Sequence, residues 1–294
     1  MRFIPGMTGL LRKEVNMMSG WDENYERRRE IVRSMNVMDD DFFAKIAEDV
    51  PAMEEILSVF FRDSKLRLKW SRPQVHLRNC GARSVTVDAM CESTEGTLYS
   101  IEMEKSSRDD HQRRVRYNSS NIDTMYTEKG LDFKKIPNLC MVYLSRADFL
   151  RGGRCLYHVD RTVKEDGRIV VNGMQEIYIN ARVNDGSEAA QLMQYMKDTR
   201  GENPLFPKLS ARVRYLKEER KGVERMCEAV EKYAQEKAKE AVKKAKEEAR
   251  KEAKAAAKSS AALLFQNGVS FDIVAKSIRQ LTRKELEKIY QGAH

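Results

Sequence analysis

Residues 85–105 restrict the fold most, because apolar and polar side chains alternate there around a short turn. Four apolar residues from Val85 to Cys91 alternate with less apolar ones, as the side chains of a strand do. The segment Thr-Glu-Gly at 94–96 suits a three-residue hairpin loop with its glycine in the left-handed conformation. The sequence therefore predicts two antiparallel strands joined by a tight turn.

Three acidic residues, Asp88, Glu102 and Glu104, lie within this hairpin. Glu102 and Glu104 are two residues apart, so both point to one face of the second strand. A three-residue loop pairs Asp88 with Glu102, and directly opposed residues have Cβ atoms about 4.5–5.5 Å apart. Two carboxylates at that distance destabilise a sheet unless a positive charge, such as a divalent cation, lies between them. A two-residue loop would shift the register by one residue and put the two acids on opposite faces, so both geometries are open.

The periodicity of the surrounding residues predicts an α/β chain. The spacing of apolar residues favours a helix with a break near Pro51, a second helix capped by Ser107, and strands around them. The pair Asn172-Gly173 is a hairpin signal, and the expected strand at 138–144 is apolar on both faces. The expected helices are 39–61 and 107–130, and the expected strands are 73–79, 138–144, 154–159 and 168–180.

The positive charge of the chain could meet a polyanion. The chain has 54 Lys and Arg against 45 Asp and Glu, a net charge of +9, which makes DNA a candidate partner. In the expected helix 107–130, Arg113, Arg114 and Arg116 either form a solvated face or contact phosphates. The same helix has an apolar stripe, which consists of Val115, Ile122, Met125 and Tyr126.

The C-terminal third is predicted to be helical. Residues 211–258 are rich in Ala, Glu and Lys and predict a long solvated helix, a spacer or a loose dimer stalk rather than a tight coiled coil. Residues 259–294 predict three short helices in a helix-turn-helix-like module, which suits either dimerisation or DNA binding. The expected organisation is an extension at 1–36, an α/β domain at 37–210, the long helix, and this module.

Cysteines and apolar runs indicate the compartment. Five scattered cysteines without a C-x-x-C pair argue against a disulfide framework and a zinc knuckle. No apolar run approaches the roughly 20 residues of a membrane span. We expect a cytoplasmic protein with no membrane partner, and a homodimer through the C-terminal helices is a further expectation.

Asp88, the strand Ile-Glu-Met-Glu-Lys at 101–105, the helix at 113–123 and the order of elements resemble the PD-(D/E)XK nuclease family transposases, also called recombination-promoting nucleases. The resemblance covers about residues 37–220. It implies a restriction-endonuclease-like α-β-β-β-α-β core and a Mg²⁺-dependent DNA endonuclease, with Mn²⁺ as a substitute ion. It also implies that Asp88 and Glu102 bind the metal, assisted by the carbonyl of Met103.

Glu104 departs from this family, which has Lys or Gln at its position. An ionised carboxylate cannot donate a hydrogen bond to an attacking water. Glu104 therefore either joins Asp88 and Glu102 as a catalytic residue that holds a second metal ion, or leaves the donor role to another group. Lys105 through a bulge, or an arginine of the next helix, would supply that donor. The alternative hypothesis is a catalytically degenerate relative that binds DNA or acts as a structural or interaction protein.

Overall fold

The computed structural model describes residues 25–78, 83–104 and 111–293, and these form two compact units. The first unit extends to Ala229 and the second begins at Val230. Among the described helices, none combines the length and the apolarity needed to cross a bilayer. The predicted cytoplasmic location and homodimer stay predictions.

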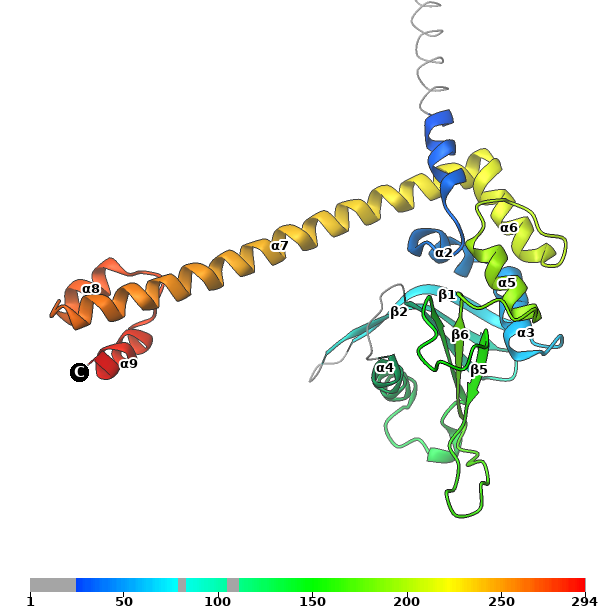
Figure 1. Ribbon diagram of the computed structural model, residues 1–294, viewed down its shortest axis with the longest axis horizontal. Coiled ribbons are helices and arrows are strands. Elements are labelled where there is room, and N and C mark those ends of the chain that lie inside the picture. Colours follow the sequence, from blue (N-terminus) through cyan, green and yellow to red (C-terminus); the bar gives the residue numbers. More distant parts are fainter. Residues whose placement is uncertain (1–24, 79–82, 105–110, 294) are drawn as a thin grey trace, which may run out of the picture. The chain divides into compact units, whose positions relative to one another are not determined.

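A six-stranded mixed sheet forms the centre of the first unit, in the order β1-β2-β3-β4-β6-β5 (Figure 1). Strands β1, β2 and β3 form an antiparallel meander, β3, β4 and β6 are parallel, and β5 is antiparallel to β6. The predicted α/β class with a mixed sheet flanked by helices is therefore confirmed. The strands are β1 Leu68–Leu77, β2 Val85–Ser93, β3 Leu98–Glu104, β4 Leu139–Ser145, β5 Leu156–Val159 and β6 Met174–Asn180.

The β2–β3 turn has the predicted three-residue loop. Gly96 has φ +86°, and the backbone N–H of Ser93 donates to the carbonyl of Thr97 at 2.9 Å. The ladder runs from this turn to the pair Ala89–Ile101. The pair Asp88–Glu102, which the three-residue loop predicts, would be the next one in this register, just beyond the end of the ladder.

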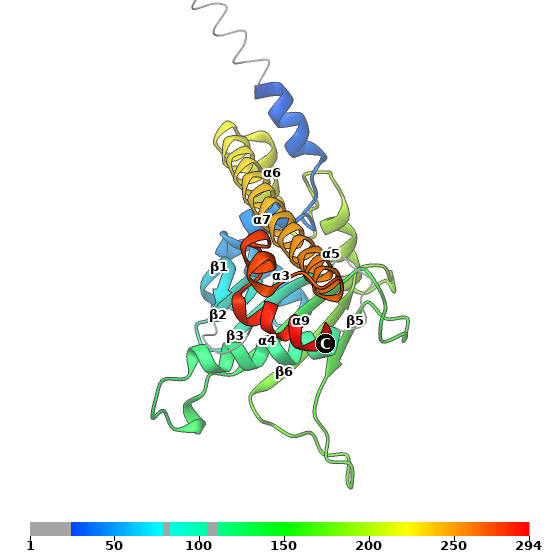
Figure 2. The same cartoon turned by 90° about the vertical axis from the view of Figure 1, so that its left-hand side faces the viewer.

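Helices cover both faces of the sheet. The central strand β4 is therefore buried on both sides, as predicted. Every residue of β4 is buried. Helix α4, His111–Tyr126, joins β3 to β4 and lies on the side of the sheet away from α5, Glu188–Lys197, and α6, Pro207–Glu218 (Figures 1 and 2). Under α4 the core consists of Leu77, Val87, Met90, Leu98, Val115, Ile122, Leu139, Met141, Tyr143 and Tyr178.

The edge strand β1 begins five residues before the predicted start and contains an irregularity beside Asp88. Pro73 is tolerated because β1 is an edge strand. Gln74 has φ +46° and lies between residues paired with Ala89 and Val87, so it is opposite Asp88. Val87 and Met90 are three residues apart and yet belong to the same core cluster, so the alternation of strand β2 is interrupted at this point.

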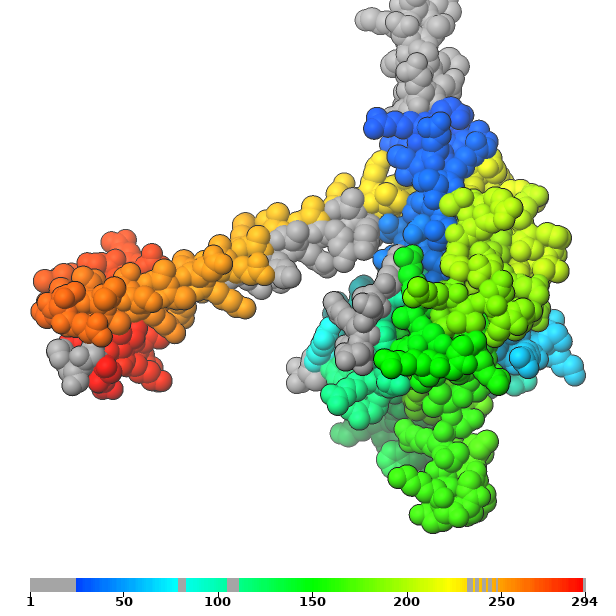
Figure 3. All heavy atoms as spheres, in the orientation of Figure 1, coloured from blue at the N-terminus to red at the C-terminus, as the bar shows by residue number. Residues whose placement is uncertain are grey.

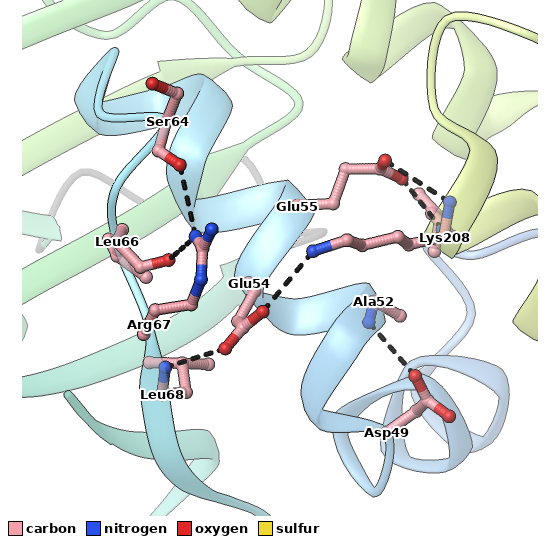
Figure 4. Close-up of polar contacts among 10 residues, drawn as sticks. Asp49, Ala52, Glu54, Glu55, Ser64, Leu66, Arg67, Leu68 and Lys208 are labelled. Carbon is pink, nitrogen blue, oxygen red and sulfur yellow. Dashed lines mark hydrogen bonds and ion pairs between the residues drawn. The ribbon is translucent and has the colours of Figure 1, made fainter. Parts of the chain in front are cut away.

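The helix predicted over 39–61 is broken as expected near Pro51. Helix α2 spans Asp40–Ala47 and α3 spans Val50–Phe61, and the Asp49 side chain accepts from the N–H of Ala52 at 3.0 Å. Two glutamates of α3 then join other elements to it (Figure 4). Glu54 accepts from the N–H of Leu68 at 2.9 Å, and Glu55 accepts from the first backbone N–H groups of α6.

Three sequence predictions about the first unit are wrong in detail. Residues 168–171 form only a single bridge, between Thr162 and Ile169, and no hairpin turns at Asn172-Gly173. Gly173 has φ +79°, and a Cβ added there would lie 2.7 Å from Oδ1 of Asn138. Met125 is 56% exposed and does not belong to the apolar stripe of α4. The Ser107 cap lies outside the described residues.

The expected single helix from residue 211 is two helices, α6 and α7, with α7 spanning Arg220–Gln266. Glu219 between them has an extended backbone, with φ −84° and ψ 134°. Gly222 follows the break, and a Cβ there would lie 2.0 Å from the carbonyl oxygen of Tyr215. The close approach of the two helices explains why the chain cannot continue as one straight helix.

The three predicted C-terminal helices share one core in the second unit. Their residues form a compact mass, orange to red in Figure 3. After α7, helix α8 spans Phe271–Ser277 and α9 spans Arg283–Ala293. Gly268 has φ +76° at the end of α7, and Thr282 and Glu285 form the expected capping box at 3.0 and 3.4 Å. The small core consists of Ala261, Phe265, Val274, Ile278, Leu281 and Leu286.

Candidate active site

One face of α4 contacts both glutamates of β3. The amide Nδ2 of Asn118 donates to Glu102 Oε1 at 2.8 Å, and the guanidinium Nη1 of Arg114 donates to Glu104 Oε2 at 2.6 Å. Two residues of a strand span about 6.7 Å and four residues of a helix about 6 Å. The helix runs antiparallel to β3, as a crossover between parallel strands must. The match of the two spacings lets one helical turn bind both carboxylates.

Asp88 closes the site from the neighbouring strand. Its Oδ2 accepts from the backbone N–H of Met103 at 2.7 Å, just beyond the last pair of the β2–β3 ladder. In an extended strand the N–H and the carbonyl of one residue point to the same edge. The Met103 carbonyl therefore lies on the edge of β3 that faces Asp88, where the resemblance implies a metal ligand.

The electrostatic environment of Glu102 is unfavourable for its charge. Burial raises its pKa well above the usual range, and the nearby charge of Asp88 raises it further. Arg114 and the hydrogen bond from Asn118 act in the opposite direction but do not outweigh burial. The Glu104 side chain is only 10% exposed and forms an ion pair with Arg114. The three acids are thus held close together with one guanidinium beside them.

The three predicted DNA-binding arginines fall into two groups. Arg113 and Arg116 are exposed on α4, whereas Arg114 faces the sheet and Glu104. Asn118, which the sequence did not point to, is buried and bonds to Glu102. The sequence feature that could have indicated Asn118 is its position inside the apolar stripe of the helix, three residues after Val115 and four before Ile122.

Aromatic side chains form the wall of the site on the side of β4 and β6. Tyr143 is paired with Glu102 in the parallel register of β3 and β4. Its hydroxyl lies 2.7 Å from Nδ1 of the buried His111, the first residue of α4, whose ring stacks on Phe149 at 4.7 Å. These rings exclude water from one side of the carboxylates, which explains the large effect of burial on Glu102.

The residues present suit a magnesium ion held by few protein ligands. Mg²⁺ prefers oxygen donors, keeps several waters and is bound by only one or two carboxylates. Asp88, Glu102 and the Met103 carbonyl are oxygen donors, and a cation would offset the unfavourable charge on Glu102. Within the described residues, no three His, Cys, Asp or Glu side chains group as a complete metal site. Lys105, the suggested substitute donor, lies outside those residues.

Comparisons with known proteins identify no family. No family model matches the sequence, no curated protein is significantly similar to it, and no solved structure matches its fold. The residues around Asp88, Glu102 and Glu104 are therefore the basis for a functional proposal.

Proposed function

We propose that the protein is a Mg²⁺-dependent DNA endonuclease that hydrolyses phosphodiester bonds, related to the PD-(D/E)XK family transposases. The observation that carries the proposal is the closeness of two carboxylates: Asp88 accepts from the backbone N–H of Met103, next to Glu102, and its charge adds to burial in raising the pKa of Glu102. An apolar or neutral pair would stabilise the metal-free sheet better, so the two acids are best explained by a bound cation.

The connectivity of the first unit supports the same proposal. Helix α3 precedes the meander β1-β2-β3, and α4 then crosses over to the parallel strand β4. The same α-β-β-β-α-β order is expected of a restriction-endonuclease-like core, and the acids lie on the second and third strands of this order. The exposed Arg113 and Arg116 of α4 would contact the DNA backbone.

Each residue has a role in such a site. Asp88, Glu102 and the carbonyl of Met103 would hold Mg²⁺, or Mn²⁺ in its place. When bound, the ion polarises a phosphoryl oxygen and lowers the pKa of a water toward neutrality. Asn118 orients Glu102, and the aromatic wall around Tyr143 limits the access of bulk water to the carboxylates.

Plasmid cleavage tests the proposal. Purified protein should nick or cut supercoiled plasmid with Mg²⁺ or Mn²⁺ and not with EDTA. Asp88→Asn and Glu102→Gln should abolish the activity. The matched control is Glu92→Gln, in the same strand as Asp88, because Glu92 bonds to Trp70 and Lys69 outside the site. Cleavage that is unaffected by both site variants would contradict the proposal.

A second candidate is a degenerate relative that binds DNA or acts as an interaction protein. The ion pair between Glu104 and Arg114 favours it, because this carboxylate adds negative charge where the family has a hydrogen-bond donor. Under this alternative the wild-type protein is inert with every metal, while Glu104→Lys or Glu104→Gln gains Mg²⁺-dependent cleavage. Measuring the three proteins together separates the two candidates.

A further inference from the structure

Arg114 differs from its neighbours Arg113 and Arg116 in its surroundings. It points from α4 toward the sheet and forms a 2.6 Å ion pair with Glu104, and its side chain is 30% exposed. The carboxylate is 10% exposed, so the pair is held between helix and strand but remains accessible. Ion pairs that are largely removed from water add little to stability, because desolvation offsets the attraction. A contribution to the stability of the fold is therefore a weak explanation for this pair.

The pair is placed next to the proposed metal residues. Arg114 is one helical turn before Asn118, which bonds to Glu102. A phosphodiester lying against Asp88 and Glu102 is therefore within reach of the guanidinium. Arginine binds carboxylate and phosphate through the same planar group of N–H donors, which a lysine cannot do.

We propose that Arg114 is the positively charged group that contacts the scissile phosphate, and that Glu104 is a positioning residue that holds it rather than a metal ligand. This inference rests on the proposed nuclease function. The pair Glu104–Arg114 would then replace the single Lys or Gln of the resembling family. Arg114 on the facing helix would thus compensate for the departure at residue 104.

The role involves no proton transfer by Arg114. In hydrolysis the water oxygen forms a bond to phosphorus while the bond from phosphorus to the leaving sugar oxygen breaks. The water loses one proton to solvent and the leaving oxygen gains one. Arginine keeps its proton at every usable pH and stabilises the negative charge that develops on the phosphoryl oxygens.

The test compares wild type, Arg114→Gln, Glu104→Gln and the double variant. The matched control is Lys134→Gln, because Lys134 is exposed and lies five residues before the start of β4, whereas the site is near its end. Arg114→Gln should lower kcat about 10²–10³-fold with a smaller change in KM. Glu104→Gln should lower kcat less, and the double variant should equal Arg114→Gln, because residues acting as a unit are not additive. Arg114→Lys should recover part of the loss, which excludes a folding defect as the cause.

Mg²⁺ binding measured by calorimetry on the DNA-free protein gives a readout that is independent of activity. Glu104→Gln should leave the Mg²⁺ affinity unchanged, whereas Asp88→Asn should remove binding. A weaker affinity in Glu104→Gln would make Glu104 a ligand and overturn the inference. Wild-type kcat in Arg114→Gln, with Asp88→Asn still inactive, would overturn it and leave the nuclease proposal intact. An inert wild-type protein with every metal would overturn both.

Discussion

At the scale of single residues, the site consists of acids whose charges oppose one another. Each carboxylate accepts a hydrogen bond: Asp88 from a backbone N–H of β3, Glu102 from Asn118, and Glu104 from Arg114. Two of these three partners come from α4. A site of this kind stores unfavourable electrostatic energy in the metal-free protein, and its pH dependence is a direct measure of that energy.

Glu102→Gln should raise the melting temperature of metal-free protein at pH 7 and leave it unchanged at pH 4. The folded-state pKa of Glu102 is raised by burial and by Asp88, so the folded protein binds the proton more tightly than the unfolded chain. The stability contributed by the protonated acid is complete below about pH 4.5, the usual pKa of a glutamate, and is lost as the pH rises through the raised pKa. Thermal unfolding in EDTA from pH 4 to 8 measures this difference.

The control for this prediction is Glu128→Gln, because Glu128 is exposed beyond the end of α4. It should leave the pH dependence of wild type intact. Equal slopes of melting temperature against pH in Glu102→Gln and wild type would mean that Glu102 is charged at neutral pH in the metal-free protein.

Residue chemistry explains which parts of the site could be predicted. Asp88, Glu102 and Glu104 were found because acids within apolar strands are unusual, and the glycine of the turn set their register. Asn118 and the inward direction of Arg114 could not be predicted. A polar residue in a helical stripe is informative only when the carboxylate that it binds is known, and that carboxylate belongs to a different element.

At the scale of elements, strand β1 is irregular at the point where it passes Asp88. Gln74 has φ +46°, a conformation that costs about 1–3 kcal/mol in residues other than glycine. Gln74→Gly should therefore increase the free energy of unfolding by about 1 kcal/mol, whereas Gln74→Ala should not. In a regular strand the order would be reversed, since glycine destabilises strand interiors. Urea unfolding of the two variants determines the sign.

The contact between α6 and α7 gives a second prediction. A Cβ at Gly222 would lie 2.0 Å from the Tyr215 carbonyl oxygen, which is backbone and cannot give way easily. Gly222→Ala should destabilise the first unit by about 2 kcal/mol or more, although alanine favours helices. The matched control is Gly201→Ala, where an added Cβ meets nothing within 4 Å. A stabilised Gly222→Ala would mean that the two helices do not meet at this glycine.

Elements whose signals are local were predicted well, and those that depend on tertiary contacts were not. Strand β4 and the capping box at Thr282 and Glu285 follow from composition over a few residues. The break at Glu219 does not, because residues on both sides favour a helix and the break arises from packing. The same reason applies to Gly173, which looked like a hairpin turn and instead lies close to the side chain of Asn138.

At the scale of the whole molecule, the chain consists of two units that have separate cores. The core of the second unit consists of few side chains, and Phe265 is the largest of these that is fully buried. Its ring packs edge-on against Tyr290 at 5.0 Å and stacks with Phe271 at 5.9 Å. A small core with one central aromatic residue should be sensitive to the loss of that residue.

Phe265→Ala should therefore unfold the second unit selectively. Truncation of a buried phenylalanine costs about 3–5 kcal/mol, which is comparable to the total stability of a small unit. Calorimetry should show a transition of the second unit moved to lower temperature, and an unchanged transition of the first unit.

Ile273→Ala is the control, because Ile273 is 59% exposed and its truncation should change stability by less than about 0.5 kcal/mol. Plasmid cleavage by Phe265→Ala should persist if the catalytic residues all belong to the first unit. A single transition that shifts as a whole would mean that the two units fold together, and the site residues would then depend on the C-terminal helices for their stability.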